Sequence, residues 1–120
     1  MDERKKRGNR GEAAVASELE KQGYAILERQ YRCRWGEIDL IAQSPEGVLC
    51  FVEVKTRDES ALSAPREAVT PAKQRKLRNA ASWYLARTEQ DERLCRFDVA
   101  EVFPASAGGR RQINYIISAF

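Results

Sequence analysis

Apolar positions repeat with two different periods along the chain. Residues 11–22 and 70–87 carry apolar side chains three and four residues apart, the spacing of an amphipathic helix. β-Branched and aromatic residues gather instead in short runs bounded by turn-forming residues, which is typical of strands. These runs are residues 24–34, 35–42, 49–56, 95–103 and 112–117. The pattern predicts an α/β fold in the order αβββαββ, a mixed β-sheet flanked by helices.

Turn and cap residues support these boundaries. Thr70 lies directly before a proline, which suits the start of a helix, and Gly23 suits the end of the first helix. Residues 44–47, Ser-Pro-Glu-Gly, predict a turn between the second and third strands. We expect residues 58–68 to form a mobile loop and residues 105–109 a flexible connection, because both are rich in turn-forming or small residues.

Charged side chains interrupt the second and third predicted strands. Because a strand alternates its side chains, Glu53 and Lys55 share one face of the third strand. By the same alternation, Glu37 and Asp39 share one face of the second strand. If the two strands pair as a hairpin, Asp39 and Glu53 converge. The opposite face of the second strand then carries Ile38 and Leu40.

Converging carboxylates indicate a metal site. Two such groups repel each other and favour a shared proton or a bound cation. Mg²⁺ prefers oxygen ligands and accepts one or two carboxylates together with waters and a substrate phosphate. Lys55 would lie near the attacking water and help to neutralise the charge that develops on a phosphodiester. The structural alternative for Glu53 and Lys55 is an ion pair on a half-exposed sheet.

Composition narrows the chemistry further. The chain has 120 residues, which is the size of one domain over residues 1–120. It contains no His, and its three Cys form no C-x-x-C pair, so carboxylates and Lys are left as the catalytic candidates. The chain lacks an apolar run of membrane-spanning length, and its start is charged where a secretory signal is apolar. We therefore expect a cytoplasmic protein without a membrane span.

The net charge of +3 is unevenly distributed. Residues 1–10 read as a basic, flexible tail, and residues 73–78 hold four cations without an acid. Such clusters attract nucleic acid, although a solvated tail or an ordinary helix face looks the same. Trp35, Trp83 and Tyr84 are able to stack on bases, but core packing is the commoner role of such residues. The four cations of the second cluster are Lys73, Arg75, Lys76 and Arg78.

Several sequence blocks together resemble the YraN family of bacterial proteins, over nearly the whole chain. In order, these blocks are RGEAAVASELEKQGY, WGEIDLIA, FVEVKTR, T-P-x-K-x-x-x-L-x-x-A from Thr70, RFDVAEV and INYIISAF. That family is similar to archaeal Holliday-junction resolvases and to the restriction-endonuclease-like PD-(D/E)xK nucleases. The resemblance implies a restriction-endonuclease-like sheet-and-helix core that binds Mg²⁺ or Mn²⁺ and cleaves phosphodiesters.

Matching the blocks assigns the family's catalytic residues. The helix acid falls on Glu12, the strand Asp on Asp39, and the E-x-K pair on Glu53 and Lys55. The resemblance implies that Asp39 and Glu53 bind the metal with assistance from Glu12, while Lys55 positions or activates water. The Pro of the named motif is Ile38 here, a departure that leaves the carboxylates in place.

Two acids and one arginine complete the candidate site. Glu12 taken alone is an acid in the first turn of a helix, where the helix dipole already favours it. Glu37 faces the site and would serve as a supporting acid, an outer metal ligand or the partner of a basic side chain. Arg57 and the cations of the second helix would contact the backbone of the nucleic acid.

The expected function is that of a Mg²⁺-dependent endonuclease acting on DNA, with branched DNA in repair or recombination as the candidate substrate. One alternative is a nucleic-acid-binding module without turnover. Another is a protein-interaction module that docks through the apolar residues 113–120. Because a four-way junction needs two coordinated cuts, a homodimer would suit the endonuclease function.

Overall fold

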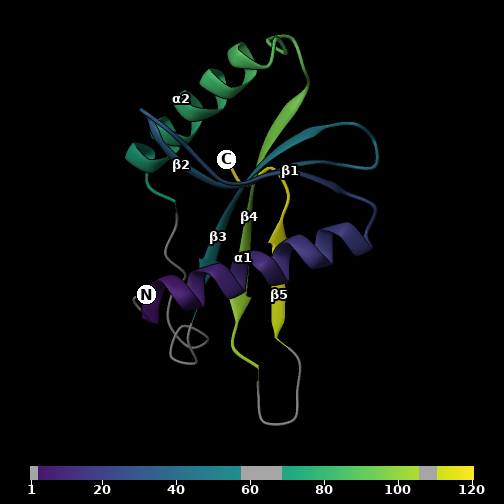
Figure 1. The fold of residues 1–120 in the computed structure, drawn as a ribbon, viewed down its shortest axis with the longest axis vertical. Helices are drawn as coiled ribbons and strands as arrows, with labels where there is room; N and C mark the ends of the chain where they lie inside the picture. The colour runs from purple at the N-terminus through teal and green to yellow at the C-terminus, as the bar shows by residue number, and fades with distance from the viewer. Residues whose placement is uncertain (1–2, 58–68, 106–110) are drawn as a thin grey trace.

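The computed structural model describes residues 3–57, 69–105 and 111–120 (Figure 1). Two helices and five strands form in the order αβββαββ, as the sequence predicts. Each of the five strands and the second helix lies within two residues of its expected boundaries. The elements are α1 (Glu3–Lys21), β1 (Ala25–Cys33), β2 (Gly36–Gln43), β3 (Leu49–Thr56), α2 (Pro71–Arg87), β4 (Cys95–Phe103) and β5 (Gln112–Ile116).

The five strands form one mixed sheet in the order β1-β2-β3-β4-β5. β3 and β4 are parallel, and the other neighbouring strands are antiparallel. A parallel pair needs a crossover connection, and α2 lies within the connection between β3 and β4. The mixed α/β architecture is therefore confirmed, and the strand order that the sequence left open follows the chain.

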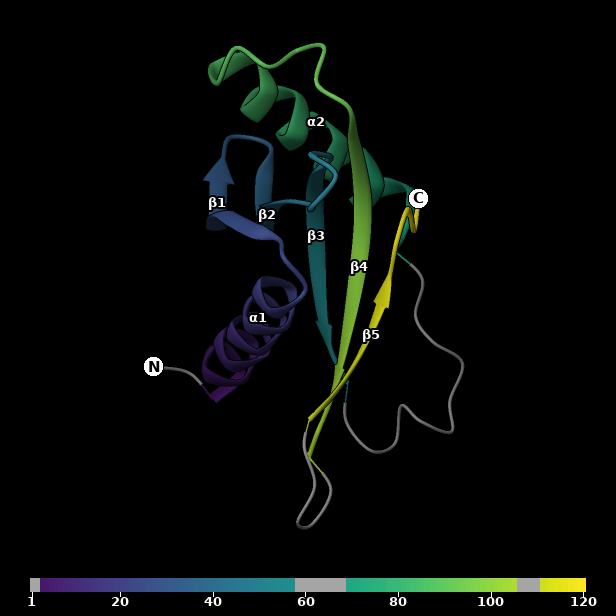
Figure 2. The ribbon, with the colours of Figure 1, turned by 90° about the vertical axis from the view of Figure 1, so that its right-hand side faces the viewer.

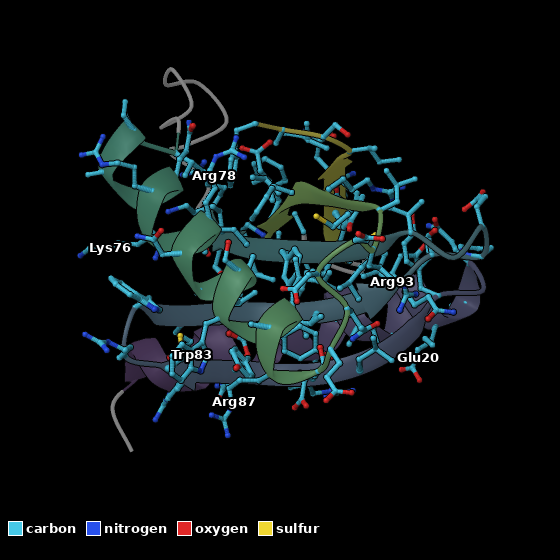
Figure 3. All side chains as sticks on the ribbon, turned by 90° about the horizontal axis from the view of Figure 1, so that it is seen from above. Glu20, Lys76, Arg78, Trp83, Arg87 and Arg93 are labelled. Carbon is cyan, nitrogen blue, oxygen red and sulfur yellow. The ribbon has the colours of Figure 1, made fainter. Side chains whose placement is uncertain are left out.

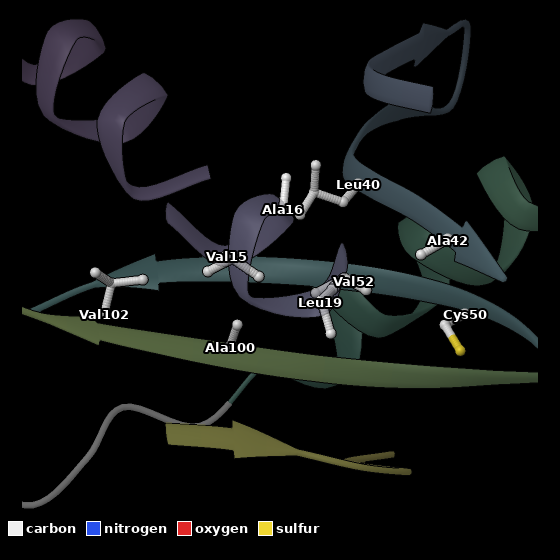
Figure 4. Packing of buried hydrophobic residues seen from close by; sticks show 9 residues of the cluster. All are labelled: Val15, Ala16, Leu19, Leu40, Ala42, Cys50, Val52, Ala100 and Val102. Atoms are coloured by element: carbon white, nitrogen blue, oxygen red, sulfur yellow. The ribbon is translucent and has the colours of Figure 1, made fainter. Parts of the chain in front are cut away.

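One helix covers each face of the sheet (Figure 2). The apolar stripe of α1 packs on one face, where Figure 4 shows its contacts with small and β-branched residues of β2, β3 and β4. α2 packs on the other face against aromatic and aliphatic side chains. The first cluster contains Val15, Ala16, Leu19, Leu40, Ala42, Cys50, Val52, Ala100 and Val102. The second contains Ile38, Ile41, Leu49, Phe51, Leu77, Ala80, Ala81, Tyr84 and Phe97.

α1 starts eight residues earlier than the hydrophobic period predicts. The expected basic tail, residues 1–10, is helical from Glu3 onward. Most of these residues are Glu, Lys and Arg, which form helices well but supply no apolar stripe for a periodicity argument to detect. No described helix offers an apolar stretch of membrane-spanning length. The two expected loops, at 58–68 and mostly at 105–109, lie outside the described residues.

β2 twists sharply near the candidate site. Ile38 and Leu40, which strict alternation puts on one face, belong to opposite core clusters. Two features of the sheet explain this correction. β1 contains a bulge at Leu27, between the pairs Ile26–Ala42 and Glu28–Ile41, and bulges increase local twist. In addition, β2 pairs with β3 only through residues 40–43, so its first half is free to follow β1.

Candidate functional site

The site forms where β2 and β3 separate. The last residue pair between these strands is Leu40–Val52, although β3 continues to Thr56. Beyond that pair, the backbone N–H of Val54 donates to Asp39 Oδ2 over 2.7 Å. The Asp39 carboxylate thus replaces the missing strand partner of Val54. This bond holds the carboxylate in the opening between the two strands.

Glu53 lies beside Asp39 with almost no access to solvent. Its exposed fraction is 7%, and its Oε2 atom has no hydrogen-bond partner among the described residues. Its Oε1 atom lies 3.8 Å from Lys55 Nζ and 3.6 Å from Lys73 Nζ. Burial, followed by the charge of Asp39, raises the pKa of Glu53 to about 7 against the lowering effect of the two lysines.

Glu12 reaches the same place from α1. Its Oε2 atom accepts a hydrogen bond from Gln30 Nε2 over 3.0 Å, and one of its carboxylate oxygens lies within 4.8 Å of an Asp39 oxygen. Burial is the main cause that raises the pKa of Glu12 to about 7. The charge of the neighbouring Asp39 adds to this rise. Burial also raises the pKa of Asp39.

Gln30 belongs to the site although the sequence patterns did not indicate it. Its φ of 49° lies in the left-handed region, which is costly for a residue with a Cβ. Gln30 stands on β1, close to the bulge at Leu27. A polar residue within a predicted strand can be seen in the sequence. The contact of Gln30 with Glu12 could not be predicted, because it depends on how α1 packs on the sheet.

Glu37 completes an acidic cluster. Glu12, Glu37 and Asp39 each offer an oxygen atom within 4.8 Å of the others. Glu37 also pairs with Arg32, with 3.0 Å between Oε2 and Nε, so it is the partner of a basic side chain, which was one of its three expected roles. The three acids whose oxygen atoms lie within this distance thus include Glu37, whereas the family resemblance assigned Glu53 as the third acid. Glu53 lies next to this group, because the charge of Asp39 acts on it.

The donor set fits a hard divalent cation. Its atoms are all carboxylate oxygens, which Mg²⁺ and Mn²⁺ prefer over nitrogen or sulfur ligands. The Oε2 atom of Glu53, which has no partner within residues 3–57, 69–105 and 111–120, is a buried acceptor that a cation would satisfy. A bound cation would also offset the mutual repulsion that helps to raise the pKa values of Glu12 and Glu53.

The basic residues divide into two groups. Arg57, expected at the nucleic acid, pairs with the buried Glu101 over 3.3 Å, and its side chain is 12% exposed. Lys73, expected at the backbone of the nucleic acid, lies against Glu53. Arg75 and Lys76 are exposed on α2, as a contact surface requires. The sequence could not show the Arg57 pairing, because it depends on the register between β3 and β4.

Comparison with known proteins identifies the family. The sequence model of the uncharacterised protein family UPF0102 matches residues 11–102. The chain belongs to this family. The matched segment contains all four candidate catalytic residues, Glu12, Asp39, Glu53 and Lys55.

Similar UPF0102 proteins occur in distant bacteria. The one from Symbiobacterium thermophilum is 52% identical over 113 residues, which are 94% of this chain and 94% of the relative. The one from Gloeobacter violaceus is 47% identical over 122 aligned positions, covering 100% and 96%. A third, from Pelobacter propionicus, is 46% identical over 114 residues, covering 94% and 81%. These matches confirm the YraN resemblance at the level of the family.

Proposed function

We propose that this UPF0102 protein is a divalent-metal-dependent endonuclease that acts on branched DNA. The observation that carries the proposal is the acidic opening between β2 and β3. There, a buried carboxylate oxygen of Glu53 lacks a partner among the described residues and two lysines stand on its other oxygen. The mixed sheet with a helix on each face supports a restriction-endonuclease-like fold for the chain.

Asp39, Glu53 and Glu12 would hold Mg²⁺ or Mn²⁺, with Glu37 at the outer side. When bound, such an ion neutralises phosphate charge and makes water more acidic. The side chains prepare the site for it. Asp39 is oriented by the Val54 N–H, and Glu12 by Gln30, so two carboxylates are held in position before an ion arrives.

Lys55 and Lys73 supply positive charge on the other side of Glu53. Each amino group lies within 4 Å of Glu53 Oε1. Lys55 is anchored on β3 and is 27% exposed, so it can donate to an attacking water or to a phosphate oxygen. Lys73 stands in the first turn of α2, where the positive end of the helix dipole adds to its charge.

The test is a cleavage assay on four-way-junction, flap, single-stranded and linear duplex DNA with Mg²⁺ or Mn²⁺. We expect Asp39→Asn, Glu53→Gln and Lys55→Met each to lower cleavage by about a hundredfold or more, because each removes charge at the reacting phosphate. Glu20→Gln changes an exposed acid farther along α1 and should cleave like the wild type (Figure 3).

Binding without cleavage on every substrate would overturn the nuclease proposal in favour of a module that only binds nucleic acid. The protein-interaction alternative predicts no salt-dependent DNA binding at all. Part of residues 113–120 packs within the chain, whereas Ile116 and Ile117 are exposed. Phe120 stacks on Phe97 at 5.2 Å, and the Ala119 N–H donates to the Phe97 carbonyl oxygen.

A further inference from the structure

We propose that an unpaired single-stranded arm of the DNA binds along one flank of α2 and stacks its bases on Trp35 and Trp83. The inference rests on the proposed function in one respect, namely that the bound strand leads to the acidic site. Its own support is a row of cations and aromatic rings that the hydrophobic core does not use.

The flank is defined by helix geometry. Lys73, Lys76, Trp83 and Arg87 follow one another at spacings of three, seven and four residues, so they lie within about 80° around the α2 axis. Figure 3 shows Lys76, Trp83 and Arg87 along one side of the helix and Arg78 on the other side. Arg78 covers the ring of Phe97 at 5.0 Å and is engaged there.

The turn between β1 and β2 lies beside α2 in both ribbon views (Figures 1 and 2). The contact is made by Tyr31 of β1, whose ring meets that of Tyr84 edge-on at 5.2 Å. The turn presents Trp35, which is 39% exposed, and Arg34 lies 4.9 Å above its ring. The commoner role of core packing therefore holds for Tyr84 but fails for Trp35.

Two arginine–tryptophan pairs thus stand on neighbouring elements. Arg87 lies 5.5 Å from the centre of the Trp83 ring, and Arg34 lies 4.9 Å from that of Trp35. Trp83 is partly exposed, and neither tryptophan belongs to the two core clusters of the described residues. An indole held by a guanidinium combines a stacking surface with a cation for the phosphate, which is what single-stranded nucleic acid requires.

Charge and position favour a nucleic acid strand as the occupant. α2 contains no Asp or Glu, so a polyanion meets cations in its first two turns and at Arg87 without any opposing charge on the helix. The row starts at Lys73, which contacts Glu53, and runs to Arg87, about 21 Å along the axis. That length corresponds to about six stacked bases. Because bases in a duplex already stack on each other, the rings favour unpaired DNA.

The chain itself provides the probe for a test. Trp35 and Trp83 are its two tryptophans, so all tryptophan emission comes from the proposed surface. We would titrate a 15-nucleotide oligo-dT strand and a 15-base-pair duplex into the full chain in EDTA, where cleavage is absent. We expect the single strand to quench the emission and to bind more tightly than the duplex.

Variants then locate the contact by fluorescence anisotropy of the labelled strand. Trp35→Ala and Trp83→Ala should each weaken binding on the order of tenfold, whereas Trp→Phe at the same positions should retain most of the affinity. Arg87→Ala should reduce the salt slope by about one. Lys21→Ala removes an exposed cation at the end of α1 and serves as the matched control. Circular dichroism verifies that each variant is folded.

Wild-type affinity in both alanine variants would overturn the proposal, as would binding of the strand without any change in emission, or no binding. Failure of the nuclease proposal looks different. If the strand binds and quenches the emission but no substrate is cleaved in Mg²⁺, the single-strand surface is supported and the nuclease proposal fails. If the protein cleaves DNA and the tryptophan variants bind like the wild type, the nuclease proposal is supported and the single-strand surface fails.

Discussion

At the residue scale, three neighbouring carboxyl groups set the chemistry of the candidate site: Glu53 is buried, and Glu12 and Asp39 are partly buried. Glu12 and Glu53 reach pKa values of about 7, and the pKa of Asp39 is also raised, chiefly because burial disfavours their charged forms. Asp39 stands between the other two and contributes repulsion to both. In the absence of a cation the cluster therefore carries protons near neutral pH that exposed acids would have lost.

This proton uptake predicts a pH-dependent stability. A carboxyl whose pKa is higher in the folded than in the unfolded state binds more protons when folded, so its contribution declines as pH rises from about 4.5 to about 7. We expect the free energy of unfolding of the wild type to fall by roughly 1–3 kcal/mol relative to Glu53→Gln over this range. Urea unfolding of both proteins in EDTA from pH 4.5 to 8 measures it; parallel curves would contradict the assignment.

Metal addition should act in the opposite direction. A cation that binds the folded site stabilises the fold and displaces these protons. At pH 7.5, Mn²⁺ at about a hundredfold above its dissociation constant should increase stability by roughly 2–3 kcal/mol in the wild type and much less in Asp39→Asn. Thermal unfolding with and without EDTA detects the difference. An equal gain in both proteins would place the ion elsewhere.

At the scale of the element, α2 owes its start to one side chain. The Thr70 hydroxyl oxygen accepts a hydrogen bond from the Lys73 N–H over 3.2 Å, and Pro71 occupies the first position of the helix. The cap therefore holds the backbone of Lys73, whose side chain reaches Glu53. It links the beginning of α2 to the candidate site.

Thr70→Ala should cost about 1 kcal/mol of stability, because it leaves a helix N–H without its partner. We also expect a lower cleavage rate at saturating substrate, since the first turn that carries Lys73 loosens. Chemical denaturation and cleavage kinetics measure the two effects. Ser82→Ala, an exposed hydroxyl in the middle of α2, is the control. A Thr70→Ser variant that restores neither property would contradict the capping role.

At the scale of the whole molecule, Asp98 joins segments that are distant in sequence. Its buried carboxylate accepts hydrogen bonds from Arg96, from the Tyr115 hydroxyl over 2.6 Å and from the Ser118 N–H over 2.9 Å. Arg96 also donates to the hydroxyl of Tyr24, which follows α1. The network thus connects β4 with β5, the end of the chain and the entry to β1.

Asp98→Ala should destabilise the protein by roughly 3–5 kcal/mol, because it leaves the partly buried Arg96 guanidinium and two donors without their acceptor. Urea unfolding measures the loss, and Glu92→Ala, at an exposed acid before β4, is the comparison. A change within 0.5 kcal/mol of that control would show that water replaces the carboxylate at little cost.

Local pattern was enough for most of the fold. β3 and β4 end where predicted because their β-branched and aromatic runs stop at Arg57 and at Pro104. The start of α1 was missed because the charged residues from Glu3 onward carry no apolar period. The faces of Ile38 and Leu40 were missed because alternation assumes a regular strand, and β2 is bent by its pairing with a bulged neighbour.

The sequence by itself determined the elements, their order and the strand acids of the candidate site, because helix and strand periods and residue chemistry are local properties. Glu12 was assigned only through the family resemblance. Only the tertiary structure decided which acids meet. It joined Gln30 to Glu12, engaged Arg57 with Glu101 and brought Lys73 to Glu53. These contacts depend on where β2 leaves β3 and on how each helix packs across the sheet, and neither is encoded in the spacing of residues along the chain.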